Sequence, residues 1–365
     1  MTNIKIINDQ ASLKRACEEL NQGQTIALDT EFMREKTFVP LLCLIQVCSD
    51  NRDYCIDPLK VQDLSPFADL VAQPEMITIL HSCRQDFEAL DTRISKSVAN
   101  LFDTQLAAAF CGYGDQVSYA GLVEILTGTK LAKSHTRANW QKRPLSSAEI
   151  EYAMDDVRYL EPLHDQLSIA LERAGRLPWF VEECQRQLDP DYWRVDPEQA
   201  WKRLKGGGNL PAQAQETARR LAIWREHQAI RRDRPREWVL STAALLQISR
   251  LNPETESQLI QIEEVNTGVI RNSADAILEI CASSARDHDA EPLWVRQQML
   301  DAEQKKRVKG VMTMLRQAAE ELGISASLLA NRNAVERFVR DNAEIDLFRG
   351  WRREVIGEQV LRHYS

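Results

Sequence analysis

Residues 25–32, TIALDTEF, decide the fold prediction. The apolar, partly β-branched beginning of this stretch is typical of a buried strand, and two carboxylates, Asp29 and Glu31, stand one residue apart at its end. Side chains of a strand alternate between its two faces, so residues i and i+2 point the same way. Asp29 and Glu31 are therefore expected on one face, where their charges repel unless protons or cations compensate them.

Strand and helix patterns surround this stretch in the first half of the chain. Short apolar runs predict strands at residues 41–48, 54–56 and 76–80, and the residues SDNRD at 49–53 predict a hairpin turn. Helical spacing predicts helices at 84–94, 104–110, 119–127 and 148–169. This order indicates an α/β domain in which helices flank a mixed sheet.

The composition narrows the class of protein. A chain of 365 residues with 44% hydrophobic and 27% charged residues is expected to form two or three soluble globular domains. No apolar run reaches the length of about 18 residues that a membrane span needs, and the N-terminal residues lack the pattern of a signal peptide. We therefore predict a cytoplasmic protein with no membrane association. The net charge of −8 argues against nucleic-acid binding through overall charge, although local basic surfaces remain compatible with it.

The domain organisation follows from a change of pattern near the middle of the chain. Residues 188–210, LDPDYWRVDPEQAWKRLKGGGNL, are rich in proline, glycine and charge, which predicts a linker. The pattern beyond is helical, with a weaker break at 283–292. We predict a first domain over residues 1–205 and helical domains over 210–290 and 291–365. The eight cysteines have neither a CxxC pair nor the spacing of a zinc site and are expected to be buried and reduced.

Further acids follow two of the predicted elements. Asp86 lies in ITILHSCRQDFEAL, in the first turn of a helix after a strand, and Tyr152 and Asp156 lie four residues apart in SSAEIEYAMDDVRYLEPL. That spacing places both on one helix face, whereas Asp155 is rotated away. Each motif alone has an ordinary structural explanation as a turn, a helix start or surface packing. Four carboxylates and a phenol in this order fit a two-metal phosphoryl-transfer site.

The segments LDTEF, HSCRQDFEAL and YAMDDVRYL resemble the three motifs of the DEDD exonuclease superfamily, in its tyrosine-containing branch, and most closely the ribonuclease D family. The resemblance implies a ribonuclease H-like exonuclease domain at 1–205 followed by two all-α helicase-and-RNase-D C-terminal (HRDC) domains. The segment RLAIWREHQAIRRDRPREWVL supports an HRDC domain at 210–290, whereas residues 291–365 match only in part and are expected to form a divergent HRDC-like domain.

The same resemblance implies the roles of the acids. Asp29, Glu31 and Asp156 would ligate one divalent ion, Mg²⁺ or Mn²⁺, Asp29 would bridge to a second, and Asp86 would lie near that second ion. Tyr152 would orient the attacking water. A phenol whose ordinary pKa is near 10 suits hydrogen bonding better than proton abstraction.

The activity implied is that of a 3′→5′ exoribonuclease that releases nucleoside 5′-monophosphates. Its expected partner is RNA with a free 3′ end, such as a tRNA precursor, and no obligate protein partner is predicted. Two alternatives stay open: a 3′→5′ DNA exonuclease of the same superfamily, and a non-catalytic protein that binds or tethers RNA.

Candidates for contact with RNA come from three places. Thr30 and Phe32 flank the strand acids, and His81 precedes Asp86. The segment KLAKSHTRANWQKRPL interleaves basic residues with an aromatic one, as proteins that bind single strands do, and supplies the candidates Arg137, Trp140 and Arg143. Alternative explanations are a packed histidine at position 81 and a loop that Trp140 anchors to the core. Asp103 is expected to be a helix N-cap. The basic cluster of the first helical domain, Arg231, Arg232, Arg234 and Arg236, is either a solvated helix end or a further RNA contact.

Overall fold

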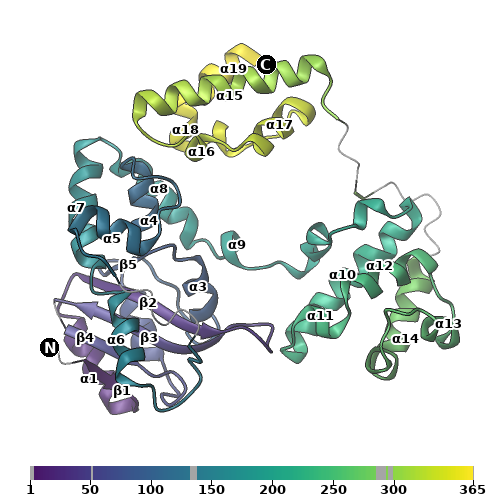
Figure 1. The fold of residues 1–365 in the computed structure, drawn as a ribbon, viewed down its shortest axis with the longest axis horizontal. Helices are drawn as coiled ribbons and strands as arrows, with labels where there is room; N and C mark the ends of the chain where they lie inside the picture. The colour runs from purple at the N-terminus through teal and green to yellow at the C-terminus, as the bar shows by residue number, and fades with distance from the viewer. Residues whose placement is uncertain (1–3, 51, 132–137, 285–292, 295–298, 365) are drawn as a thin grey trace. The chain divides into compact units, whose positions relative to one another are not determined.

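The computed structural model describes all residues except 1–3, 51, 132–137, 285–292, 295–298 and 365 (Figure 1). The chain forms two compact units. The first contains residues 1–33, 42–193 and 299–365, and the second contains residues 34–41 and 194–298. This division describes packing alone, and the three predicted domain ranges stay a prediction.

The first unit is built on a mixed sheet. In the described residues the sheet has six strands in the order β1-β4-β3-β2-β5-β6. β1 pairs with β4, β2 with β5 and β5 with β6 in parallel, whereas β3 pairs with β4 antiparallel. The strands are β1 (Lys5–Ile7), β2 (Thr25–Met33), β3 (Leu41–Ser49), β4 (Arg52–Ile56), β5 (Ile77–Leu80) and β6 (Leu101–Asp103). The strand that carries Asp29 and Glu31, β2, thus has a neighbour on each side.

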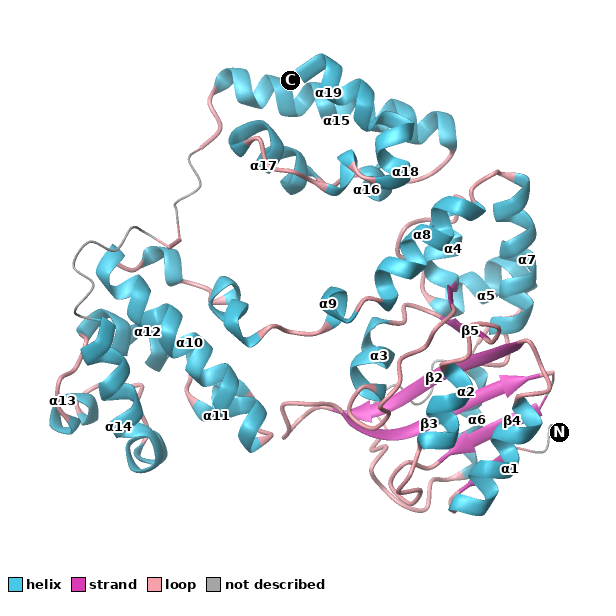
Figure 2. Ribbon diagram, turned by 180° about the vertical axis from the view of Figure 1, so that it is seen from behind, coloured by secondary structure: helices cyan, strands magenta, loops and turns pink. Residues whose placement is uncertain are grey.

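Helices cover both faces of this sheet. Figure 1 shows α6 over one face, and Figure 2, from behind, shows α2 over the other. Within residues 1–193 of the first unit, the described helices are α1 (Gln10–Leu20), α2 (Ser65–Val71), α3 (Arg84–Leu90), α4 (Thr104–Phe110), α5 (Tyr119–Thr127), α6 (Ser147–Asp155), α7 (Leu160–Arg173), α8 (Leu177–Leu188) and α9 (Pro190–Trp193). The apolar side chains of the central strands, such as Ile26, Leu28 and Ile45, are fully buried between the layers. The predicted mixed sheet flanked by helices is confirmed.

Two local predictions differ from the structure. The helix predicted at 148–169 is wrong, because α6 ends at Asp155 and α7 begins at Leu160. Arg158 in the intervening turn donates hydrogen bonds to Asp53 of β4 (2.8 Å) and to Glu151 (2.8 Å), which ties the turn to the sheet. Asp156 therefore caps the end of α6. The three-residue strands β1 and β6 were not predicted, since so short a run carries no alternation to read.

Several local predictions are confirmed. The register of β3 and β4 pairs Ser49 with Arg52, so a tight hairpin joins them where SDNRD predicts one. Asp103 is the N-cap of α4 and accepts hydrogen bonds from the amides of Gln105 and Leu106. All eight cysteines are free, and all but the partly buried Cys111 are buried.

The second unit has its own helical core. Its helices are α10 (Ala212–Arg232), α11 (Arg236–Val239), α12 (Thr242–Leu251), α13 (Glu256–Ile260) and α14 (Thr267–Ser284), preceded by the 3₁₀ helices η1 (Pro197–Arg203) and η2 (Gly207–Asn209). Leu221, Leu245 and Ile277 are fully buried in its core. Leu204 and Leu210 of the predicted linker are also buried there, so this end of the linker is packed against the helices.

The last helices belong to the first unit by packing. They are α15 (Ala302–Leu322), α16 (Ala326–Leu329), α17 (Arg332–Asp341), α18 (Gly350–Arg352) and α19 (Glu358–Tyr364), with the short helices η3 (Asp346–Phe348) and η4 (Arg353–Gly357). Across the parts of the chain that the structure describes, no helix combines the length and the apolar character needed to cross a membrane.

Candidate active site

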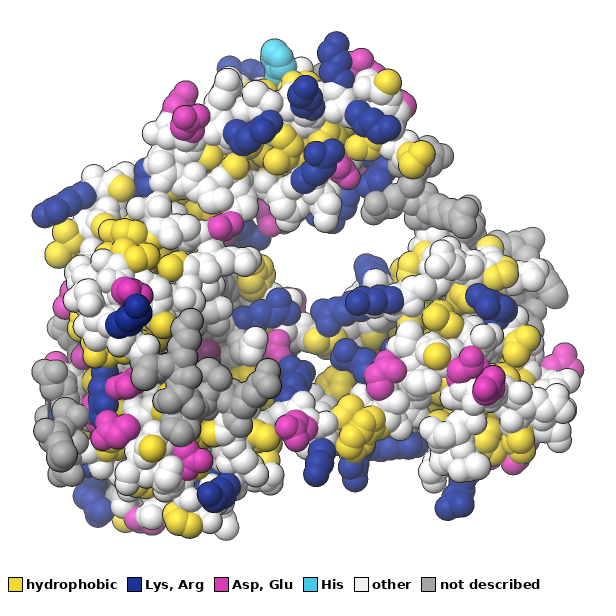
Figure 3. Space-filling view, viewed as in Figure 1, with side chains coloured by type: hydrophobic (Ala, Val, Ile, Leu, Met, Phe, Trp, Pro, Cys, Tyr) yellow, Lys and Arg dark blue, Asp and Glu magenta, His cyan; other side chains and the backbone are white. Residues whose placement is uncertain are grey.

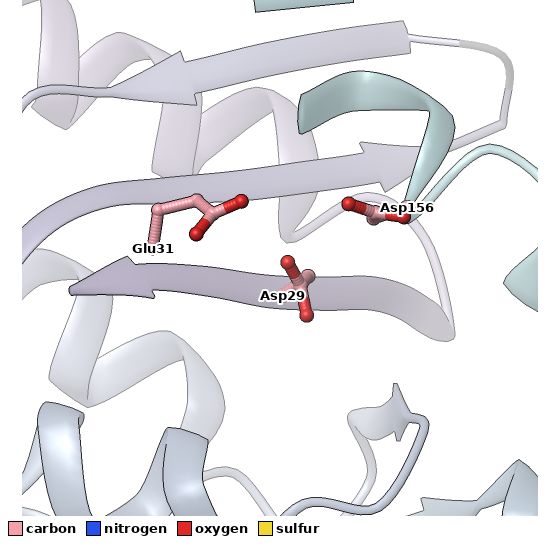
Figure 4. Close-up of side chains that lie close together, drawn as sticks. All are labelled: Asp29, Glu31 and Asp156. Carbon is pink, nitrogen blue, oxygen red and sulfur yellow. The ribbon is translucent and has the colours of Figure 1, made fainter. Parts of the chain in front are cut away.

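Three carboxylates from two parts of the chain meet beside the sheet. Asp29 and Glu31 extend from β2, and Asp156 extends from the turn that ends α6 (Figure 4). One oxygen of each lies within 4.8 Å of one oxygen of each of the others. None of the three forms an ion pair with a residue that the structure describes. The strand alternation and the position of the α6 turn thus bring together residues 127 apart in sequence, from Asp29 to Asp156.

Asp86 lies beside this group and is held by β2 itself. It follows β5, in the first turn of α3, and is 6% exposed. Its Oδ1 atom accepts hydrogen bonds from the Thr30 amide (3.1 Å) and the Thr30 hydroxyl (2.6 Å). The buried hydroxyl of Thr30, predicted as a candidate RNA contact, therefore fixes a carboxylate in this structure. Its contact with RNA stays a prediction.

No cation among the described residues compensates the negative charge of these four carboxylates, and their pKa values are raised. Burial, followed by the charges of Asp86 and Asp156, raises the pKa of Asp29 well above its usual range. Burial raises the pKa of Glu31 to about 8, with contributions from Asp156 and Asp86. Burial also raises the pKa values of Asp86 and Asp156 to about 7, although the hydrogen bonds from Thr30 oppose the shift at Asp86. At these pKa values the carboxylates tend to bind protons near neutral pH, because no cation from the described part of the chain neutralises their charges.

Tyr152 stands at the edge of the group on α6. Its ring stacks on Trp140 with the centroids 6.3 Å apart and the planes 24° apart. Burial and the charges of Asp156, Glu31 and Asp29 raise the pKa of Tyr152 to about 12. The phenol therefore keeps its proton at physiological pH and can donate a hydrogen bond.

Gln46 is a site residue that the sequence reasoning missed. It lies on β3, is fully buried, and its Nε2 atom lies 3.5 Å from Asp29 Oδ2. Its Oε1 atom has no hydrogen-bond partner among the described residues. A single amide in the apolar run LLCLIQVCS was the available signal, because a buried polar side chain needs a partner.

The remaining candidates for RNA contact fall into different settings. His81 is engaged inside the protein, with Nδ1 2.9 Å from the Thr104 hydroxyl and Nε2 3.1 Å from the Val117 carbonyl oxygen. Phe32 is half-buried on β2. Trp140 is 4% exposed, which favours the alternative that it anchors its loop to the core. Arg137 lies outside the described residues.

Arg143 is bound to protein groups on every side. Its Nε and Nη2 atoms contact the two oxygens of Asp57 at 2.6 and 2.9 Å, and Nη2 also donates to the Cys43 carbonyl oxygen at 2.6 Å. Its Nη1 atom donates to the carbonyl oxygens of Trp140 and Lys142. Its contact with RNA stays a prediction, but in this structure the side chain secures the loop against β3 and β4.

The acids fit a hard divalent cation. Carboxylate oxygens are the ligands that Mg²⁺ and Mn²⁺ prefer. Oxygens that bind one Mg²⁺ at about 2.1 Å lie within about 4.2 Å of one another, so Asp29, Glu31 and Asp156 need only small shifts to share one ion. The cluster therefore offers the donor set of a site for a divalent metal.

Comparison with known proteins places this chain in a family. A family model of a 3′-5′ exonuclease matches residues 4–172, and a model of the HRDC domain matches residues 214–281. Ribonuclease D of Pseudomonas paraeruginosa is 34% identical over 364 residues, which cover 98% of this chain and 96% of that protein. Ribonuclease D of Acidiphilium cryptum is 35% identical over 365 residues, which cover 98% of this chain and 92% of that protein.

Solved structures agree with this assignment. The crystal structure of Escherichia coli RNase D matches with a TM-score of 0.89 and 29% identity over 100% of both chains. The catalytic core of RRP6 from Trypanosoma brucei shares the fold, with a TM-score of 0.62 and 22% identity over 79% of this chain and 81% of that one. The predicted family is therefore confirmed, and this chain, with its exonuclease and HRDC domains, belongs to the ribonuclease D family of 3′→5′ exoribonucleases.

Proposed function

We propose that this chain removes nucleotides one at a time from the 3′ end of RNA with the help of two divalent ions. The observation that carries the proposal is the group of three carboxylates that lie within 4.8 Å of one another and have no cationic partner in the described part of the chain. In this assignment Asp29, Glu31 and Asp156 would hold one ion, and Asp29 and Asp86 would hold or approach the second. When bound, such ions would neutralise the charge that develops on the phosphate and activate water.

The protein residues supply position in this mechanism. Thr30 fixes the orientation of Asp86 through two hydrogen bonds, and the Nε2 atom of Gln46 lies 3.5 Å from the Oδ2 atom of Asp29. The protonated phenol of Tyr152, next to Asp156 and Glu31, orients the attacking water. Attack on the last phosphodiester then releases a nucleoside 5′-monophosphate and leaves a new 3′ hydroxyl on the RNA.

The substrate assignment rests on the relatives. The E. coli enzyme is described as an exoribonuclease involved in structured RNA processing. We assign this chain the same kind of substrate, RNA with an unpaired 3′ extension next to folded structure, and among such RNAs the tRNA precursors. The alternatives of a DNA exonuclease and of a non-catalytic RNA-binding protein gain no support from a specific observation.

One assay tests chemistry and substrate together. We would incubate a 5′-labelled RNA with a 3′ extension, and the matched DNA strand, with the wild type, Asp156→Asn and Asp155→Asn in Mg²⁺, Mn²⁺ or EDTA. Asp155 is the matched control because it neighbours Asp156 but pairs with Arg158 (3.1 Å). We expect EDTA to abolish trimming and Asp156→Asn to slow it by about 100- to 1000-fold, while Asp155→Asn retains most activity.

Each contrary result of this assay has a distinct meaning. Full trimming in EDTA contradicts the metal mechanism. Trimming by Asp156→Asn at the wild-type rate contradicts the site. Faster degradation of the DNA strand favours the DNA exonuclease, and absence of trimming by the wild type on either strand favours the binding protein.

A further inference from the structure

The turn between α6 and α7, which contains Asp156, is held by a side chain from another helix. In an uninterrupted α-helix the Tyr159 amide would donate to the Asp155 carbonyl oxygen, four residues earlier. No such hydrogen bond is present in the described part of the chain. The Tyr159 amide instead donates to the phenol oxygen of Tyr119 (3.3 Å), and the Tyr119 hydroxyl donates to the Asp155 carbonyl oxygen (2.9 Å). One hydroxyl is thus inserted between the two partners of a helical hydrogen bond.

This insertion gives a physical reason for the break between the two helices. A side chain that enters the ladder of helical hydrogen bonds interrupts the helix at that point. The bonding also tightens just before the insertion, because the amides of Asp156 and Val157 donate to carbonyl oxygens three residues earlier, at 3.3 and 3.1 Å. Such bonds form the 3₁₀ pattern that is frequent at helix ends. Residues 148–169, whose helical spacing is continuous, therefore form two helices with Asp156 between them.

The packing of α5 explains why Tyr119 reaches this turn. Tyr119 is the first residue of α5, and Leu122 and Val123, three and four residues later, are fully buried. These spacings place the three side chains on one face of the helix. A different face is in solvent, since Ile125 is 54% exposed and Figure 3 shows hydrophobic side chains at the surface in the region of α5 and α7. The buried residues of α5 thus anchor the helix with its first side chain against the turn.

The Tyr119 ring is also supported by His81. The two rings meet edge to face, with centroids 5.6 Å apart and planes 66° apart. His81 is itself bound to the Thr104 hydroxyl and the Val117 carbonyl oxygen. Burial raises the pKa of the Tyr119 phenol, so the hydroxyl keeps its proton and remains a donor. The position of this hydroxyl is therefore fixed from outside the turn that it holds.

We propose that Tyr119 is a positioning residue of the candidate active site, whose hydroxyl keeps the turn after α6 open and thereby holds the Asp156 carboxylate beside the acids of β2. Without the hydroxyl, the Tyr159 amide can bond the Asp155 carbonyl oxygen directly. The helix would then continue through Asp156, and a carboxylate that lies within 4.8 Å of both strand acids would rotate about the helix axis away from them. The proposal rests on the proposed function only in taking these three acids as a metal site.

The test compares two substitutions that each remove one phenol hydroxyl from the full-length protein. Tyr119→Phe removes the inserted group. Tyr54→Phe is the matched control, because Tyr54 is fully buried on β4 and its hydroxyl donates to Glu19 of α1 (2.6 Å) instead of to the turn. For the wild type and both variants we would measure hydrogen exchange of the Tyr159 amide in EDTA, binding of Mn²⁺ without RNA by calorimetry, and the rate of RNA trimming at graded Mg²⁺ concentrations.

Both variants should melt about 2 to 4 °C below the wild type, because each loses one hydrogen bond, but only Tyr119→Phe should change the turn and the metal site. In EDTA its Tyr159 amide should exchange severalfold more slowly than in the wild type, since the amide gains a helical hydrogen bond. Its affinity for Mn²⁺ should fall by about tenfold, as expected when a group that supports a metal ligand is lost. Half-maximal trimming should need about ten times more Mg²⁺, with KM for RNA unchanged. Tyr54→Phe should match the wild type in all of these measurements.

The contrary outcomes are equally defined. Unchanged or faster exchange of the Tyr159 amide in Tyr119→Phe, an unchanged affinity for Mn²⁺, or an equal loss of affinity in Tyr54→Phe each overturn the proposal. A wild type that binds Mn²⁺ but trims no RNA counts against the proposed function, while the comparison of Mn²⁺ affinities still decides the role of Tyr119. A wild type that binds no Mn²⁺ contradicts the metal site and overturns both. Failure of the positioning role is thus distinguishable from failure of the exonuclease.

Discussion

Strands β2 and β4 belong to the same sheet, and acids lie on β2 and on or directly after β4. Only the acids at β4 have arginine partners among the described residues. Asp53 on β4 accepts a hydrogen bond from Arg158 at 2.8 Å, and Asp57 directly after β4 accepts two from Arg143 at 2.6 and 2.9 Å. Asp29 and Glu31 on β2 have no such arginine among the described residues. Arginines reach the acids at β4 of the same sheet, whereas none of the described residues brings one to the acids of β2, so these acids are available to a cation from outside the chain.

The difference separates a stabilising arrangement from a functional one. A buried ion pair holds its two elements together, and its loss leaves one charge stranded. Unpaired carboxylates that are partly removed from water oppose folding until a cation or a proton neutralises them.

The largest effect on stability is expected at the paired site. Asp57→Asn leaves Arg143 buried without its counter-charge, so the free energy of unfolding should fall by about 3 kcal/mol. Urea unfolding followed by circular dichroism measures it. Asp50→Asn is the control, because Asp50 pairs with Arg52 at the surface (3.0 Å) and should lose less than about 1 kcal/mol. Equal losses in the two variants would show that the buried pair has no special weight.

Arg143 also shows which contacts the sequence alone does not predict. A basic residue in a loop near Trp140 predicts a nucleic-acid contact, and this stays a prediction. Charge alone did not predict that Arg143 also binds an aspartate 86 residues away. Thr30 gives the same lesson, since its hydrogen bonds to Asp86 join elements 56 residues apart. Contacts of this kind depend on the packing of layers, which no local pattern contains.

The strands and the acids themselves were predictable for a physical reason. β2 and β3 are long apolar runs, and strand alternation alone places Asp29 and Glu31 on one face. The position of Asp156 was predicted only in part, because the i, i+4 argument assumed a continuous helix and the structure places the residue at the C-cap of α6. Gln46 was missed because an isolated amide in a strand gives no spacing to compare with another residue.

A smaller effect is expected on turnover at Tyr152, which stands beside the unpaired acids. Since its pKa is raised to about 12, the phenol acts with its proton in place, and Tyr152→Phe removes only a hydrogen bond. We expect turnover to fall by about 100-fold with metal affinity unchanged, as measured by single-turnover kinetics and calorimetry with Mn²⁺. Tyr113→Phe, at an exposed position, is the control. Weaker metal binding at unchanged turnover per loaded enzyme would instead make Tyr152 part of the metal site.

The smallest effect concerns pH and tests the unpaired acids directly. The pKa values of Glu31, about 8, and of Asp86 and Asp156, about 7, lie above the ordinary values of 4.5 and 3.8 expected in the unfolded chain. The folded protein therefore holds protons that the unfolded chain has lost, so the stability of the metal-free protein should fall as pH rises from about 4 to 8. Mg²⁺ must displace those protons and should stabilise the protein more at pH 8 than at pH 6, by about 1 to 2 kcal/mol.

Thermal unfolding with EDTA or Mg²⁺ at the two pH values measures this difference, and Asp29→Asn provides the comparison. This substitution removes one of the repelling charges, so the metal-free variant should melt at a higher temperature than the wild type at pH 8 and gain less from Mg²⁺. Asp57→Asn, in contrast, should melt lower in both conditions and keep the full response to the ion. If Asp29→Asn were destabilised like Asp57→Asn, the acids of β2 would be structural partners of a cation within the chain, and the contrast between the two strands would disappear.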